Sequence, residues 1–177
     1  MRVIVPGATG NVGTSVIQAL SKSPELDRYL ADAHAIEQQA LQLLESGPKL
    51  VRDEELAHLF REHLDETRRH VRLVEKRLEA RDAGPSLVKD AALRAGGLHI
   101  GAPFGAQPDT TTKLAGFAFA FEHLEIAAYE PLERVARRAG DEDAVSMAEE
   151  ILAEERAAAE KIAATWDREA VSLGVAS

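Results

Sequence analysis

The chain has 177 residues, 45% of them hydrophobic and only 5% aromatic, and its formal net charge is −9. This length suits one well-buried domain, and the negative charge argues against nucleic acid or an anionic membrane as a partner. The absence of cysteine excludes disulfides, thiol catalysis and cysteine-bound zinc or iron–sulfur sites. Any metal must therefore be bound by oxygen and imidazole nitrogen. Because the sequence has no signal-peptide pattern and no apolar run of about 20 residues, we expect a cytoplasmic protein with no membrane partner.

The first 22 residues differ in pattern from the rest of the chain. A short β-branched run at residues 2–5 precedes the glycine-rich segment GATGNVG at residues 7–13. This segment resembles the start of an NAD-dependent epimerase or short-chain dehydrogenase, in which the glycines let the backbone approach a dinucleotide. A second parallel strand, which such a domain requires, does not follow. We therefore interpret residues 1–22 as a Rossmann-like remnant, mobile or loosely docked on a domain formed by residues 23–177.

From residue 23 onward the hydrophobic pattern is helical. Ser23 followed by Pro24 is typical of a helix N-cap and its first position, and Gly and Pro residues separate the helical segments. The periodicity predicts four long helices, at about residues 24–45, 53–81, 110–139 and 143–172. A short additional helix is predicted at residues 86–95.

The lengths of the connections predict the topology. The first and second helices are joined by a short link, as are the third and fourth, so each pair should form an antiparallel hairpin. The connection between the hairpins has roughly 28 residues and contains the short helix. The predicted fold is therefore all-α, a ferritin-like four-helix bundle with one long crossover that contains a short extra helix.

One glutamate interrupts the apolar stripe near the middle of each predicted long helix. These residues are Glu37, Glu66, Glu125 and Glu155. A carboxylate in a helical core is costly unless it is paired, and four that converge would repel one another. One or two divalent cations are the simplest way to stabilise such a cluster.

The second helix adds imidazole nitrogen to these oxygen ligands. Its predicted core stripe is Leu59, His63, Glu66, His70 and Leu73. Imidazole with carboxylates suits iron, manganese or zinc, and two carboxylate-bridged ions are the usual arrangement in a bundle core. The alternative is that some of these side chains lie at the edge of the bundle and reach water. The predicted metal ligands are Glu37, Glu66, His70, Glu125 and Glu155, with Glu122 and His63 as further candidates.

Several segments carry a family resemblance. They are YLADAHAIEQQ at residues 29–39, HLDET at 63–67 followed by His70, FEHLEIAAY at 121–129 and EERAAAEK at 154–161. Residues from about 26 to 170 resemble the YciE/YciF-type ferritin-like proteins, a bacterial group linked to stress responses. The resemblance implies a ferritin-like bundle with a di-iron site.

The resemblance also suggests roles for the ligands. Glu37 and Glu125 would be terminal ligands, Glu66 and Glu155 would bridge the ions, and His70 would complete the first site. The last helix departs from the broader ferritin-like pattern, because Ala158 and Ala159 stand where a histidine or second carboxylate would follow Glu155. We therefore expect the second metal to be bound more weakly or not at all.

The leading functional hypothesis is a ferritin-like metal-binding protein that acts in iron or oxidative-stress handling. It would hold two iron ions, with manganese or zinc as alternatives, and dioxygen or peroxide would be the reaction partner. Whether it is an enzyme, as a ferroxidase or peroxide-reducing oxidoreductase, stays open, and no catalytic side chain or organic cofactor is assigned. We expect a homodimer. Two alternatives remain: a non-enzymatic stress or assembly bundle with an incomplete metal site, and an NAD(P)-binding protein that uses the N-terminal glycine motif.

Overall fold

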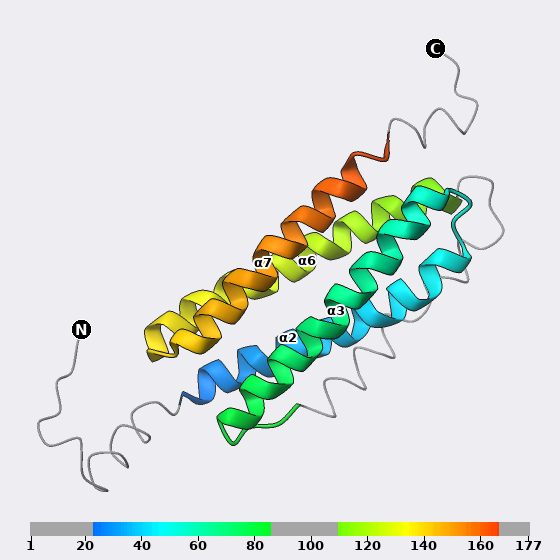
Figure 1. Ribbon diagram of the computed structural model, residues 1–177. Coiled ribbons are helices and arrows are strands. Elements are labelled where there is room, and N and C mark those ends of the chain that lie inside the picture. Colours follow the sequence, from blue (N-terminus) through cyan, green and yellow to red (C-terminus); the bar gives the residue numbers. More distant parts are fainter. Residues whose placement is uncertain (1–22, 86–109, 167–177) are drawn as a thin grey trace, which may run out of the picture.

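The computed structural model describes residues 23–85 and 110–166, and the rest of the chain is not described. The predicted N-terminal remnant, the short helix at residues 86–95 and the last helix from residue 167 onward therefore lie outside the described residues. Within them the chain forms no strand. It forms α2 (Pro24–Ser46), the 3-10 turn η1 (Gly47–Lys49), α3 (Glu54–Ala80), α6 (Thr110–Ala139) and α7 (Glu142–Ala163) (Figure 1).

Polar side chains fix where three of these helices begin. The Ser23 hydroxyl accepts a hydrogen bond from the Leu26 N–H, and the Asp53 carboxylate accepts one from the Leu56 N–H at 2.7 Å. Each satisfies a donor that the first turn of a helix leaves unpaired. Asp141 caps α7 in the same way, so that α7 begins at Glu142. α7 ends at Ala163, earlier than the predicted residue 172.

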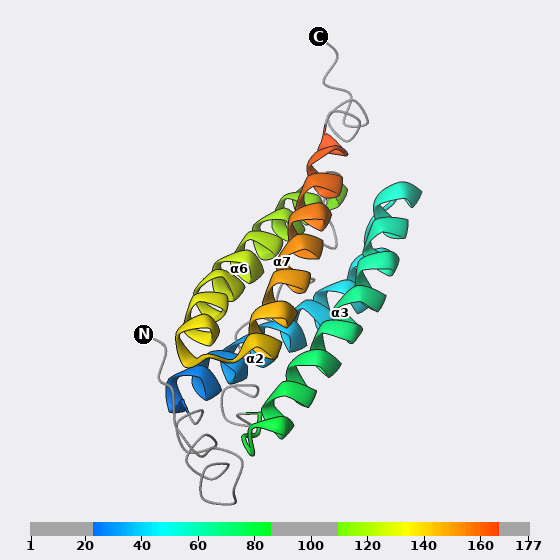
Figure 2. The same cartoon turned by 60° about the vertical axis from the view of Figure 1, so that its left-hand side comes forward.

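The four helices pack as two antiparallel hairpins. α2 packs on α3 and α6 packs on α7, and the hairpins meet through α2 against α6 and α3 against α7 (Figures 1 and 2). All neighbouring helices are antiparallel in this arrangement, so α3 and α6 lie on a diagonal and run in the same direction. The end of α3 at Ala80 and the start of α6 at Thr110 therefore lie at opposite ends of the bundle. The predicted four-helix bundle with one long crossover is confirmed.

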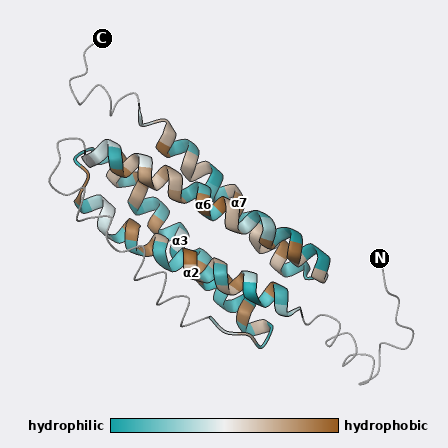
Figure 3. Ribbon diagram, turned by 180° about the vertical axis from the view of Figure 1, so that it is seen from behind, coloured by the Kyte–Doolittle hydropathy of each residue, from teal (hydrophilic) through white to brown (hydrophobic). Residues whose placement is uncertain are grey.

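Hydrophobic and hydrophilic residues are interspersed along every helix, as expected of amphipathic helices in a bundle (Figure 3). Two apolar clusters fill the core, one around Tyr129 and Leu132 and the other around Phe60 and Phe121. The predicted stripe of the second helix is correct for His63 and His70 and wrong for its other three members. Leu59, Glu66 and Leu73 are only partly buried, and the buried face of α3 instead comprises Leu56, Phe60, His63, Thr67, His70, Val74 and Leu78.

A cluster of ion pairs joins three helices at one end of the bundle. Arg77 Nη2 and Arg81 Nη1 both donate to Asp141 Oδ2, at 2.6 and 2.7 Å. Arg81 Nε also donates to Asp27 Oδ1 at 2.6 Å. These bonds tie the last turns of α3 to the starts of α2 and α7, which helps to fix the register of the helices. None of the helices in the described part of the chain is long and apolar enough to span a membrane.

Candidate metal centre

Six acidic and imidazole side chains from all four helices converge in the middle of the bundle. α2 contributes one, α3 two, α6 two and α7 one, and each residue is at most 5% exposed. They are Glu37, His63, His70, Glu122, Glu125 and Glu155. Potential ligand atoms of these residues form two groups that could each hold a metal ion, and within each group the atoms lie within 4.8 Å of one another.

The first group combines His63, Glu122, Glu125 and Glu155. His63 Nε2 lies 3.0 Å from Glu122 Oε2 and 3.3 Å from Glu155 Oε2. Glu122 and Glu125 are three residues apart on α6, so that both carboxylates reach the same face. The group offers one nitrogen and three carboxylates, a set suited to a transition-metal cation.

The second group combines Glu37, His70 and Glu155. His70 Nδ1 lies 2.9 Å from Glu155 Oε1 and 3.6 Å from Glu37 Oε1. Glu155 belongs to both groups, with one oxygen facing His63 and the other facing His70. Its carboxylate therefore has the position of a bridge between two ions, whereas the second group has one ligand fewer than the first.

Glu66 is the one predicted ligand that the structure does not bring into either group. Its side chain is 35% exposed, and Oε2 lies 2.9 Å from His63 Nδ1, on the side of the ring away from the cluster. At this level the buried face of α3 lies about one position from the predicted stripe, and Thr67 rather than Glu66 points into the core. The predicted bridging role of Glu66 has no support in this geometry.

Many polar atoms of the cluster lack a hydrogen-bond partner although they are buried. The short distances to the imidazole nitrogens given above do not meet hydrogen-bond geometry. The unpartnered atoms in the cluster are Glu37 Oε2, His63 Nε2, His70 Nδ1, Glu122 Oε2, and both carboxylate oxygens of Glu125 and of Glu155. Each buried polar atom without a partner costs roughly 1–3 kcal/mol. This concentration of such atoms at one level of a helical core is the arrangement that a bound cation would satisfy.

Burial and mutual contact shift the pKa values of the cluster in opposite directions. Burial raises the pKa of Glu37 and strongly raises that of Glu125, with repulsion from Glu155 adding to both. Burial also raises the pKa of Glu122 to about 7. For Glu155, burial acts in the same direction, but the contacts with His63 and His70 outweigh it and lower the pKa well below its usual range.

The two histidines are shifted upward. Burial would lower the pKa of His70, but the facing carboxylates of Glu155 and Glu37 raise it to about 10. Contacts with Glu122 and Glu155 likewise raise the pKa of His63 against the effect of burial. Without a cation, protons on the imidazoles and carboxyl groups therefore reduce the repulsion within the cluster. A metal ion binding here would have to displace these protons.

Each histidine also contacts a carboxylate on its outer side. Glu154 Oε2 lies 2.7 Å from His70 Nε2, and Glu66 Oε2 lies 2.9 Å from His63 Nδ1. Arg69 in turn donates to Glu154 and Glu150. A carboxylate behind a metal-binding histidine fixes the ring orientation and its tautomer.

Tyr129 orients the carboxylate of Glu37. Its buried hydroxyl donates to Glu37 Oε1 at 2.6 Å, whereas Glu37 Oε2 has no hydrogen-bond partner. Neither Tyr129 nor Glu154 was predicted as a site residue. Tyr129 lies four residues after Glu125, on the same helix face, and a buried tyrosine hydroxyl needs a partner. That spacing could have identified it, whereas the position of Glu154 depends on how α7 packs against α3.

Solved structures of other bacterial proteins share this arrangement of helices. A protein from Xanthomonas campestris pv. campestris is 28% identical, with a TM-score of 0.70 over 84% of this chain and 92% of that chain. The stress protein YciF from E. coli is 22% identical, with a TM-score of 0.71 over 85% of this chain and 96% of that chain. A dodecameric thioferritin, the bacterioferritin-related protein from Bacteroides fragilis, is 18% identical, with a TM-score of 0.71 over 91% and 95%. At these last two identities the likeness shows the fold alone, a ferritin-like four-helix bundle.

The family model described as a domain of unknown function (DUF892) matches residues 24–172 of this chain. The match covers most of the chain and includes every residue of the buried cluster. The resemblance to YciF-type proteins is therefore supported for the helical part, whereas the resemblance of the first 22 residues to an epimerase is not. The chain belongs to the DUF892 family.

Proposed function

We propose that this protein binds two divalent metal ions in the buried cluster, one in each ligand group, with Glu155 as the shared ligand. The observation that carries the proposal is the set of buried, unpartnered side-chain oxygen and nitrogen atoms in the described part of the chain, of which all but Thr112 Oγ1 come from residues of the two groups. A bundle core that left these atoms unsatisfied would be strongly destabilised. Cations of the right size remove that cost.

The ligand chemistry favours iron, with manganese or zinc as alternatives. The cluster offers carboxylate oxygen and imidazole nitrogen, and the chain has no cysteine. Two proteins with the same fold, a stress protein and a bacterioferritin-related protein, agree by their names with a role in iron or oxidative-stress handling. Iron bound in such a centre supplies one-electron redox chemistry toward dioxygen or peroxide.

The contribution of this chain's own residues is to position the ligands and to exclude bulk water. Glu154 and Glu66 hold the outer nitrogens of the two imidazoles, and Tyr129 holds one oxygen of Glu37. The apolar clusters on both sides of the centre keep its local dielectric low, which strengthens every interaction between a cation and these carboxylates.

Metal content and stoichiometry test this proposal. Protein purified without chelator is analysed for bound metal, stripped, and titrated anaerobically with Fe(II) and separately with Mn(II). We expect two equivalents per chain, with weaker binding in the group of Glu37, His70 and Glu155, because it has three ligand residues instead of four. This reverses the order expected from the sequence, in which the site completed by His70 was the stronger. The absence of bound metal together with the absence of any equivalence point would contradict the proposal.

A second candidate is a stress or assembly bundle whose metal site is incomplete. The group of Glu37, His70 and Glu155 favours it, because this group offers three ligand residues where the other offers four. The same titration separates the two candidates. One equivalent, without a change in absorbance on exposure to dioxygen or peroxide, would favour the incomplete site.

A further inference from the structure

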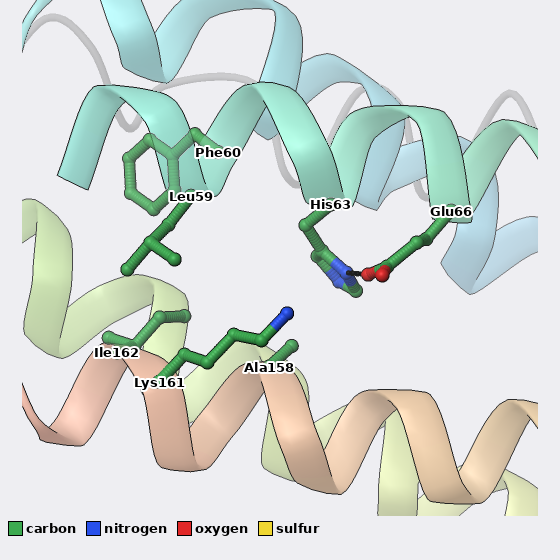
Figure 4. Close-up of a pocket in the computed structure, with 7 residues that line it drawn as sticks. All are labelled: Leu59, Phe60, His63, Glu66, Ala158, Lys161 and Ile162. Atoms are coloured by element: carbon green, nitrogen blue, oxygen red, sulfur yellow. Dashed lines mark hydrogen bonds and ion pairs between the residues drawn. The ribbon is translucent and has the colours of Figure 1, made fainter. Parts of the chain in front are cut away.

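A hollow between α3 and α7 ends at the buried metal centre. The space in it that a water molecule can occupy is only about 10 Å³, and its walls include Leu59 and Phe60 on α3 and Ala158 and Ile162 on α7 (Figure 4). His63 and Glu66 also line it, so that the hollow reaches one of the proposed ligands directly. A second hollow between the same helices, near Leu73 and Met147, is lined by none of the six residues of the cluster.

The polar groups along this hollow form a continuous path from solvent to the cluster. The half-exposed carboxylate of Glu66 lies 2.9 Å from His63 Nδ1. The opposite nitrogen of the same ring lies 3.0 Å from Glu122 and 3.3 Å from Glu155. A cation held by Glu66 would therefore be separated from the buried carboxylates by one imidazole ring, that of His63.

A positive charge lies beside the hollow. Lys161 is exposed, lines the hollow from α7, and extends its side chain toward His63 and Glu66 (Figure 4). Its ammonium is near enough to attract the Glu66 carboxylate. The same charge repels an approaching cation, so Lys161 and Glu66 act on a metal ion in opposite senses.

We infer that this hollow is the route by which a divalent cation reaches the centre, with Glu66 as its first ligand and Lys161 as a charge that slows its arrival. The inference rests on the proposed function and adds to it an access site and two residues that control the rate of metal uptake. It also gives a role to Glu66, which belongs to neither ligand group. Because the hollow has room for about one water molecule, passage requires the His63 ring and the side chains beside it to move aside.

Association kinetics of Co(II) with the metal-free, full-length protein test this inference. The absorbance of bound Co(II) reports binding, and stopped-flow and equilibrium titrations give the rate constants and the Kd separately. Ala158→Leu fills the hollow without removing a ligand. We expect it to slow association and dissociation several-fold by the same factor, with an unchanged Kd. The matched control is Ser146→Leu, which places the same side chain at the second hollow and should change neither rate.

Lys161→Glu tests the charge at an exposed position in the last turn of α7. We expect association to accelerate by roughly threefold at moderate ionic strength, and the gain to shrink as salt screens the charge. Glu66→Gln should slow association. Wild-type rates in both Ala158→Leu and Lys161→Glu, alongside normal equilibrium binding, would overturn the access route and leave the proposed function intact. Failure of the wild-type protein to bind Co(II), Fe(II) or Mn(II) at equilibrium would overturn the proposed function as well.

Discussion

Replacing Glu155 by Gln is the most informative single change to the cluster. Its carboxylate is fully buried, belongs to both ligand groups and lies 2.9 Å from His70 Nδ1 and 3.3 Å from His63 Nε2. Glutamine keeps the size of the side chain but removes the charge and one acceptor oxygen. If two cations share this carboxylate, Glu155→Gln should weaken both sites together, an effect that no other cluster residue should have.

The size of the effect follows from ligand linkage. At a metal concentration a hundred times the Kd, binding stabilises the native state by about 2.7 kcal/mol. For a chain of this length this corresponds to a rise in Tm of roughly 5–11 °C. If the loss of Glu155 raises the Kd about a hundredfold, the gain at the same metal concentration falls to about 0.4 kcal/mol, or roughly 1 °C.

The assay is thermal unfolding followed by circular dichroism, with each variant compared with its own metal-free form. This internal reference is needed because Glu155→Gln also removes a buried partner of His63 and His70. We expect that cost to stay below about 3 kcal/mol, since Glu122 and Glu154 still face the two rings. Glu160→Gln, the same change at an exposed position of α7, is the control. A metal-dependent gain in Glu155→Gln equal to that of the wild type would refute the shared-ligand argument.

Two further predictions concern pH and packing. In the folded protein the pKa of His70 is raised from 6.5 to about 10 and that of Glu122 from 4.5 to about 7. The metal-free protein should therefore lose stability as pH rises from 4.5 toward 10. The metal-dependent rise in Tm should increase over the same range, which thermal scans at several pH values would measure. A metal-dependent gain in Tm that does not change with pH would be inconsistent with proton displacement. Gly47→Ala should destabilise the fold by about 1–3 kcal/mol in urea unfolding, because an added Cβ would lie 2.7 Å from the Phe60 ring. Gly116→Ala, where nothing lies within 4 Å, should instead stabilise α6 by about 0.5–1 kcal/mol, and equal effects of the two changes would contradict this account.

The fold could be predicted in most respects because its signals are local. Ser23 and Asp53 cap helices at their predicted starts, and the position of α6 follows from its apolar period. The topology followed from connection lengths, since a short link permits only an antiparallel neighbour. α7 ends at Ala163, before the predicted end, and the predicted continuation over residues 167–172 lies outside the described part of the chain.

The site was predicted in its residue types but not in every position. Glu37, Glu125 and Glu155 each lie at the centre of a broad apolar face, so a small error in helix rotation leaves them buried. On α3 the polar residues Glu66 and Thr67 are adjacent, and the sequence pattern does not decide which of them faces the core. The structure buries Thr67, whose hydroxyl bonds back to the His63 carbonyl, and leaves Glu66 at the edge.

By itself, the sequence determined that acidic residues and imidazoles would meet inside a helical bundle, because helical periodicity assigns a face to each residue. Only the tertiary structure decided how they group. Their grouping depends on the rotation and axial offset of helices that are distant in sequence. These two quantities place His63 next to Glu122 on α6, Glu155 between both histidines, and Glu154 behind His70. Those two quantities are set by how side chains of neighbouring helices interlock, and no local pattern along one helix contains them.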